Sequence, residues 1–217
     1  MLNGMLWIAR SGAQWRELPQ AYGPWQSVYA RFAKWRDDGT LERVFHALSE
    51  DADKENLSID STCIKVHESA NGGEKTADKA VGRTRGGLNT KIRAIVDGLG
   101  SPVDFLLSPG NDHDSVHAVN LLGKVEISGS NILADRAYGA HTIREYISGQ
   151  GANYVIPPQG NLVSPWNIDW CLYKERHLIE CFFQKIKWFR RVATRYDKLD
   201  TSFLAFVYLA SVAILVM

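Results

Sequence analysis

The order of short apolar segments in the middle of the chain constrains its fold more than any other feature. The segment NLSIDSTCIKV alternates, with Leu57 and Ile59 on one face and Asp60 on the other, as a half-buried strand does. Residues 90–108 hold two further apolar runs on either side of the turn GLGS, and this pattern predicts a β-hairpin. Three strands in succession therefore begin the predicted sheet.

The segments that follow alternate between helix and strand. We expect Asp114 to cap a helix that runs to about Leu122, and the apolar strand NILA then leads into Asp135. A helix over 141–148 and a strand over 153–157 come next. Strand, strand, strand, helix, strand, helix, strand, helix is the order of the ribonuclease H-like fold. The prediction is an α/β (α+β) architecture with a mixed five-stranded sheet flanked by helices.

Residues 1–50 predict a small helical region ahead of this sheet. We expect a helix from Leu2 to Arg10, a second between Pro24 and Gly39, and a third capped by Thr40. Its simplest core consists of Trp7, Trp25 and Trp35. Three cations could instead face DNA in a helix-turn-helix manner, namely Arg31, Lys34 and Arg36. The polar stretch 49–56 predicts a boundary, which gives regions at 1–50 and 56–217.

The cysteines and the chain termini exclude several classes of protein. Cys63, Cys171 and Cys181 form no CxxC pair, so neither a disulfide framework nor a zinc finger is expected. The start lacks the charged-then-apolar pattern of a signal peptide, and the final FLAFVYLASVAILVM is shorter than the roughly 20 residues that span a bilayer. We therefore expect a cytoplasmic protein whose last helix is part of the core.

The net charge of +1 hides two strongly basic segments. Residues 174–198 contain eight lysines or arginines and three acidic residues, and residues 75–93 contain six and one. The second of these segments is rich in glycine and predicts a flexible loop. Two separate basic segments in a nearly neutral chain indicate a polyanionic partner.

The stretch YKERHLIECFFQKIKWFRR, residues 173–191, predicts an amphipathic helix. At about 100° per residue its apolar side chains fall on one side. The opposite arc holds Tyr173, Arg176, Glu180 and Lys187. This arc is either an ordinary solvated face or a carboxylate flanked by cations that hold phosphates.

Three carboxylates are the candidate catalytic and metal-binding residues. Asp60 lies on the first strand, Asp135 ends the fourth and Glu180 lies on the last-named helix, and the first and fourth strands are neighbours in such a sheet. Hard carboxylate oxygens from separate elements suit two Mg²⁺ ions. Asp112 and Asp114 are weaker rivals for this role. The pair His113 and His117 lacks an HExxH context and is read as surface, as is Arg136.

At these residues the chain resembles a known family. The spacing of Tyr173, Arg176, Glu180 and Lys187 is similar to the Y-R-E-K signature of the DDE transposases of bacterial insertion sequences. IDST around Asp60 and LADRAY around Asp135 resemble blocks of the same family, and GRTRGGLNTKI, IPP and FRRVATRYDKL resemble those of its insertion-sequence-five branch. The blocks follow the family's order, and the resemblance covers nearly the whole chain.

The resemblance implies a transposase that cuts DNA at the ends of an insertion sequence and joins them to target DNA. Asp60, Asp135 and Glu180 would then hold two Mg²⁺ (or Mn²⁺) ions. Double-stranded DNA would be the partner of a homo-oligomer in the bacterial cytoplasm. The expected DNA-binding residues are Tyr173, Arg176, Lys187, Arg83, Arg85, Arg190 and Arg191.

One departure from the family concerns the N-terminus. Family members commonly carry several dozen residues ahead of the block that begins NGMLWIARSG, whereas this chain begins two residues before it. The 1–50 region is therefore expected to be truncated at its start. Two alternatives stay open beside an active transposase: an inactive DNA-binding remnant, and a metal-dependent nuclease of the same fold without strand transfer.

Overall fold

A computed structural model describes residues 1–70, 80–160 and 164–216 of the chain. Within them a seven-stranded sheet has the order β2-β3-β1-β5-β6, with β4 also paired to β3 and β7 to β1. The strands are β1 (Asn56–Val66), β2 (Gly82–Thr84), β3 (Gly87–Val96), β4 (Pro102–Pro109), β5 (Asn131–Leu133), β6 (Asn153–Val155) and β7 (Thr194–Arg195).

The five predicted strands are confirmed in their predicted order. β1, β3 and β4 are antiparallel, whereas β5 and β6 run parallel to β1. Gly100, with φ of 81°, occupies the left-handed conformation in the turn between β3 and β4, where a side chain would be strained. The additions are β2 and β7, which are three and two residues long and too short to leave a periodic pattern.

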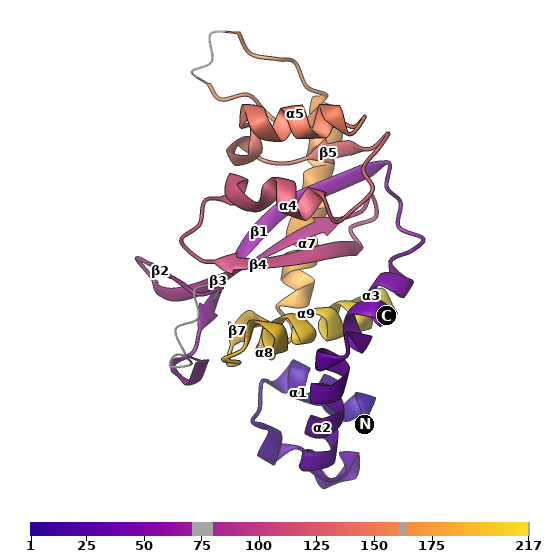
Figure 1. The fold of residues 1–217 in the computed structure, drawn as a ribbon, viewed down its shortest axis with the longest axis vertical. Coiled ribbons are helices and arrows are strands. Elements are labelled where there is room, and N and C mark those ends of the chain that lie inside the picture. The colour runs from indigo at the N-terminus through magenta and orange to yellow at the C-terminus, as the bar shows by residue number, and fades with distance from the viewer. Residues whose placement is uncertain (71–79, 161–163, 217) are drawn as a thin grey trace.

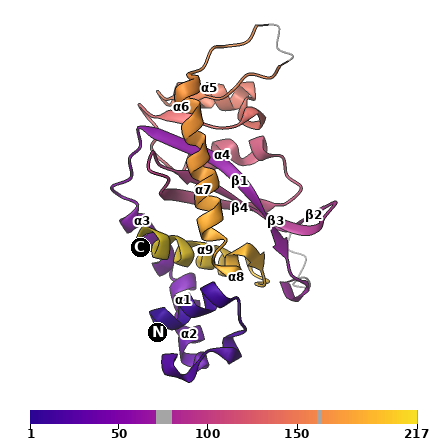
Figure 2. The same cartoon turned by 180° about the vertical axis from the view of Figure 1, so that it is seen from behind.

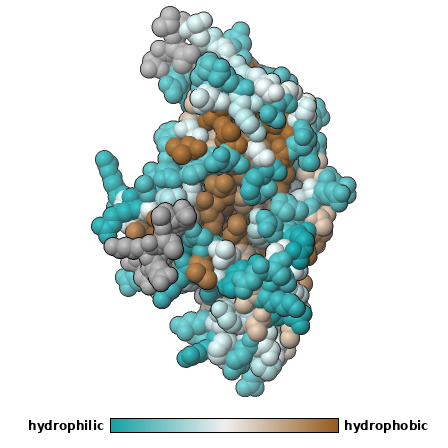
Figure 3. Space-filling view, in the orientation of Figure 1, coloured by the Kyte–Doolittle hydropathy of each residue, from teal (hydrophilic) through white to brown (hydrophobic). Residues whose placement is uncertain are grey.

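Helices cover both faces of the sheet. On one face α4 (Ala118–Leu122) and α5 (His141–Gly149) pack over a core that includes Ile59, Ile132 and Ile143 (Figure 1). On the other, α6 (Trp170–Tyr173), the 3-10 turn η6 (Lys174–Arg176) and α7 (His177–Ile186) follow one another in a long rod across the strands (Figure 2). Apolar side chains are visible in the middle of the face that carries α4, with hydrophilic ones around them (Figure 3).

The helix predicted over 173–191 ends earlier than expected. The chain turns at residues 187–189, and a separate short helix, α8 (Arg190–Ala193), follows. No glycine or proline marks this break, so residue types could not predict it. The predicted apolar side is confirmed, because Ile179, Phe182 and Ile186 are all buried.

The N-terminal helices α1 (Leu2–Ser11), α2 (Trp25–Asp37) and α3 (Thr40–Leu48) lie close to the predicted ranges. The predicted cap at Thr40 is wrong, because Thr40 is the first helical residue and Gly39 holds the capping position. They pack around the last helix, α9 (Asp200–Leu215), and share one core with it and with α7. Phe32 of α2 stacks on Phe206 of α9 at a centroid distance of 4.5 Å. The division into regions at 1–50 and 56–217 stays a prediction, since this core joins elements from both.

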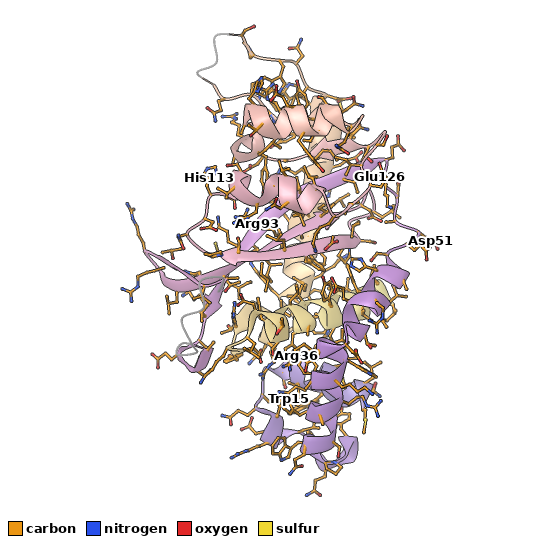
Figure 4. The ribbon with its side chains drawn as sticks, viewed as in Figure 1. Trp15, Arg36, Asp51, Arg93, His113 and Glu126 are labelled. Carbon is orange, nitrogen blue, oxygen red and sulfur yellow. The ribbon has the colours of Figure 1, made fainter. Side chains whose placement is uncertain are left out.

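The predicted tryptophan core and DNA-facing cations of this region are partly corrected. Trp7, Trp25 and Trp35 pack against the core but are only half-buried. Trp15, which sequence reasoning passed over, packs between α2 and α9 (Figure 4). Arg36 is turned inward, bonded to Asp37 and to Ser202 of α9, so it is withdrawn from the DNA-facing set.

The apolar C-terminal segment forms a core helix, as predicted. Most of α9 is buried, including Phe203, Phe206 and Leu209. Among the described residues, no helix combines the length and the apolar character that crossing a membrane requires.

Candidate active site

Two of the three predicted carboxylates come from the neighbouring strands β1 and β5 or from their immediate continuation. Parallel pairing of β1 with β5 aligns Ser58 with Leu133, and two residues further along each strand come Asp60 and Asp135. Asp135 stands just beyond the end of β5, where its Oδ1 accepts a hydrogen bond of 2.8 Å from the amide of Ala137 and caps the 3-10 turn η5 (Arg136–Tyr138).

The third carboxylate, Glu180, reaches the same region from α7, which packs against β1 and β3. Arg176 links it to the sheet: Nη2 donates to Glu180 Oε1 at 2.5 Å, and Nη1 donates to Asp60 Oδ2 at 3.1 Å. One guanidinium therefore joins two of the predicted acids. Glu180 itself is about half exposed, at 52%.

Burial and the surrounding charges make Asp60 an unusual carboxyl group. Burial raises its pKa to about 6, while the amide of Ser61 and the charge of Arg176 lower it and the charges of Asp135 and Asp114 raise it again. The positive charge around Asp60 therefore does not compensate for the loss of water and for the nearby acids.

Asp114 lies beside this group but is fully compensated. Its Oδ1 accepts hydrogen bonds from Ser61 Oγ at 2.6 Å and from Lys91 Nζ at 2.8 Å, and Arg93 approaches at 3.4 Å. Burial raises its pKa, but Lys91 and Ser61 outweigh that effect and the net pKa is lowered. These three donors all approach the same oxygen, Oδ1.

The prediction that Asp114 caps a helix is wrong. His113 is the capping residue: its Nδ1 accepts from the amide of Ser115 at the start of the 3-10 turn η4 (Asp114–His117). Figure 4 shows His113 beside Arg93, whose Nη2 donates to the His113 carbonyl. The sequence could not show this, because the partners of Asp114 come from β3, far away in the chain. His117 Nε2 lies 2.8 Å from Asp112 Oδ2.

No group of three histidine, cysteine or acidic side chains among the described residues is arranged as a metal site. The acids nevertheless belong to one region. Asp60 and Asp135 influence each other electrostatically, and Arg176 bridges from Asp60 to Glu180. The convergence of all three on shared cations therefore stays a prediction.

Several predicted DNA-binding residues surround the acids. Lys187 is exposed and donates to Thr62 Oγ1 on β1 at 2.7 Å, two residues from Asp60. Tyr173 is half-buried, with the Arg176 guanidinium 5.9 Å from its ring centroid, and Arg190 is exposed. Further away, Arg83 and Arg85 are exposed where β2 turns into β3. Lys75 and Lys79 of that basic segment lie outside the described residues.

Arg191 is a correction to the predicted DNA-binding set. Its side chain is buried, with a relative exposure of 7%, and it forms a two-pronged ion pair with Asp197. Its Nη1 also donates to the carbonyl of Ala13, so it ties α8 to the loop after α1. Its charge predicted an exposed cation, but Arg191 is buried because it pairs with Asp197, six residues along the chain.

Sequence reasoning also missed Tyr138, which is buried beside the acids at the end of η5. It stands in the block LADRAY, but nothing in its residue type separates it from an ordinary core aromatic. Its hydroxyl has no hydrogen-bond partner in the described part of the chain.

The chain matches two protein-family models. The model "Transposase DDE domain" matches residues 51–164, which include Asp60 and Asp135 and stop short of Glu180. The model "Putative transposase of IS4/5 family (DUF4096)" matches residues 1–45. The matched ranges together cover both the helical region and most of the sheet.

Relatives of known sequence agree with these matches. The "Putative transposase for insertion sequence element IS6501" of Brucella ovis is 42% identical over 124 residues, which is 57% of this chain and 95% of that protein. The "Uncharacterized protein y4sN" of Sinorhizobium fredii is 37% identical over 87 residues, or 40% of this chain and 70% of that protein.

Solved structures resemble the chain only weakly. The piggyBac transposase, solved as a synaptic complex with hairpin DNA, gives a TM-score of 0.49 at 10% identity. That alignment covers 75% of this chain, and the chain spans less than half, 46%, of that protein. A likeness at this level carries no argument about the site. From the family match over more than half of its length, the chain belongs to the DDE transposases of insertion sequences.

Proposed function

We propose that this transposase cleaves DNA at the ends of its insertion sequence and joins the freed 3′-hydroxyl to target DNA, with Asp60, Asp135 and Glu180 as its catalytic acids. The observation that carries the proposal is the arrangement of these acids. Asp60 lies on β1 two residues beyond the paired Ser58, Asp135 follows the end of the parallel strand β5 two residues beyond Leu133, and Arg176 joins Asp60 to Glu180. Crevices at the carboxyl ends of parallel strands are the usual place for ligands in open α/β sheets.

The acids fit a site for divalent cations, Mg²⁺ or Mn²⁺. All three supply carboxylate oxygens, the donors that such hard ions prefer. The raised pKa of Asp60 reflects burial beside other acids without enough positive charge, a deficit that a divalent cation makes good. Two such ions, when bound, activate the attacking water or hydroxyl and stabilise the leaving oxygen.

Arg176 has two roles in this proposal. Its guanidinium neutralises Asp60 and Glu180 in the structure, and a DNA phosphate offers the same planar fork an alternative anion. Moving from carboxylates to a phosphate would hold the DNA in place and uncover the two acids in the same step. A lysine in this position could carry the charge but could not make both contacts.

The neighbouring cations would hold the DNA backbone along α7. Lys187 and Arg190 are exposed beyond Glu180, and Tyr173 lies before Arg176 on the same rod. Their phosphate contacts would position DNA without reading its sequence. The exposed pair Arg83 and Arg85 extends the basic surface to the β2–β3 edge, and Arg31 and Lys34 of α2 are exposed as well.

Double-stranded DNA is the partner that this surface suits. We propose a homo-oligomer on DNA, because a chain with one acid set has to be paired with a second copy to process two element ends together. Gel filtration of the protein with and without a DNA end would measure this assembly.

Asp135→Asn tests the catalytic assignment. This substitution keeps the shape and the cap on Ala137 but removes a charged cation ligand. We expect cleavage of a DNA fragment that carries the element end to fall by at least about a hundredfold. Binding of the same fragment in a gel-shift assay should stay within about twofold, because phosphate contacts by lysine and arginine do not need the carboxylate.

The control is Asp112→Asn, which removes an acid that pairs only with His117 and should cleave as the parent does. Equal loss of binding and cleavage in Asp135→Asn would contradict the assignment. A parent protein that binds but does not cleave would be the inactive remnant. Cleavage without joined product would identify a nuclease.

A further inference from the structure

Tyr138 combines an apolar ring environment with an unpaired hydroxyl. Its side chain is 1% exposed, and the ring belongs to the same core as Ile59, Ala134 and Ile143. Its Oη is buried and makes no hydrogen bond with any described residue. A buried hydroxyl without a partner lowers stability, so a phenylalanine would suit this core better.

The unpaired hydroxyl is within electrostatic reach of the acids. η5, which ends at Tyr138, packs against η4, and the charges of Asp60, Asp114 and Asp135 all act on the phenol. Burial, with these charges, raises the pKa of Tyr138 far above its ordinary value. The hydroxyl therefore keeps its proton and can serve as a hydrogen-bond donor at any working pH.

Of these acids, Asp60 is the one whose hydrogen-bond donor, the Arg176 guanidinium, could move to a DNA phosphate. Asp114 is held by Ser61 and Lys91 within the protein. Asp60 Oδ1 accepts from its neighbouring amide, whereas Oδ2 depends on Arg176, whose guanidinium a DNA phosphate would attract. Without Arg176, Oδ2 of this partly buried carboxylate would lose the only donor it has among the described residues.

We propose that Tyr138 is a positioning residue of the acid site: its hydroxyl donates a hydrogen bond to Asp60 when Arg176 turns to a DNA phosphate. This inference rests on the proposed function, in which Asp60 binds a divalent cation. Carboxylates that bind cations are themselves held by hydrogen bonds from surrounding groups, which fix their orientation. The unpaired hydroxyl of Tyr138 would be the donor that fixes the orientation of Asp60.

Tyr138→Phe tests the proposal, since it removes only the hydroxyl. We expect the DNA-free protein to melt at the same temperature as the parent or higher, because an unpaired buried group is lost. DNA affinity should stay within about twofold. Cleavage under single-turnover conditions should fall about tenfold, and Mn²⁺ binding to the protein–DNA complex, measured by calorimetry, should weaken by a similar factor.

Tyr208→Phe is the matched control. Tyr208 is also a buried tyrosine, but its hydroxyl donates to Glu42 at 2.9 Å in the helical region, away from the acids. Its loss should lower the melting temperature and leave the cleavage rate and the Mn²⁺ affinity unchanged. The two variants are thus expected to show opposite patterns.

Two results would overturn the proposal. One is a Tyr138→Phe complex that binds Mn²⁺ as tightly as the parent complex does. The other is a Tyr138→Phe protein that melts at a lower temperature and loses cleavage only because it is less stable. The proposed function fails separately, if the parent protein does not cleave or if Asp135→Asn still does. In that case the Mn²⁺ titration alone decides whether Tyr138 supports the acids.

Discussion

Two arginines from the same basic segment show how this protein separates stability from function. Arg195 on β7 has no exposed side-chain surface and bonds to Thr90, to Asp200 and to the carbonyls of Ala80, Asp197 and Lys198. Arg176 is 21% exposed and, within the described part of the chain, bonds only to two carboxylates. A saturated arginine fixes one conformation, whereas a half-satisfied arginine can exchange partners.

Lysine substitutions at the two positions test whether the number of hydrogen bonds distinguishes these arginines, and they should have the largest effects. Arg195→Lys keeps the charge but cannot reach the several acceptors that the guanidinium serves, so buried groups lose their partners. We expect the free energy of unfolding to fall by about 3 kcal/mol in urea denaturation. Arg176→Lys should change stability by less than about 0.5 kcal/mol, because its ion pairs are partly exposed.

For activity we expect the opposite order, with the larger effect at Arg176. Arg176→Lys is expected to reduce strand transfer about tenfold, since a lysine cannot make the bidentate phosphate contact. Folded Arg195→Lys protein should transfer strands at the parental rate. Similar stability losses in the two variants would show that saturation of the hydrogen bonds does not distinguish these residues.

The contrast extends to two acids, Asp60 and Asp114, whose pKa values are shifted in opposite directions. The folded-state pKa of Asp60, about 6, lies above its ordinary value of 3.8. The folded protein therefore binds this proton more tightly than the unfolded chain, and the contribution of Asp60 to stability falls as pH rises from about 4 to about 6. Above that range its charge destabilises the fold.

Asp60→Asn should therefore raise the free energy of unfolding at pH 8, by about 1 kcal/mol after the lost bond to Arg176 is allowed for. The gain should shrink at pH 4.5, while cleavage is abolished at both. Asp114→Asn is the control: its pKa is lowered, so its charge stabilises above its ordinary pKa and the variant should be less stable at pH 8. Urea titrations at both pH values measure this, and a loss of stability for Asp60→Asn at pH 8 would contradict it.

What the sequence could predict follows from how local each signal is. The strand over NLSIDSTCIKV and the buried side of α7 were predictable, because side-chain periodicity is set by the backbone. The pairing of β1 with β5, the strands that lead to Asp60 and Asp135, followed from the order of the elements in the fold. The first two signals are local, whereas this one depends on the fold as a whole.

The missed features all depend on partners that are distant in the chain or unsignalled. Asp114 has a residue type suited to a helix cap, yet Lys91 and Ser61 from neighbouring strands hold it instead. Arg191 has the residue type of a surface cation, yet it is bound to Asp197 and to the carbonyl of Ala13. Charge in a sequence does not show which charges are already paired.

The smallest expected effect concerns Lys187, the exposed counterpart of Arg176 on the same rod. Its only contact in the described structure is with Thr62, so its loss should hardly change stability. If it binds a DNA phosphate, Lys187→Ala removes one released counterion, and the slope of log K against log salt should fall by about one unit. Because the contact is to the DNA backbone, the ratio of specific to non-specific affinity should not change.

Lys185→Ala is the control for general charge, because Lys185 is exposed and makes no ion pair in the described structure. Equal slopes for the parent and the Lys187→Ala variant in fluorescence titrations would restrict phosphate binding along α7 to Arg176.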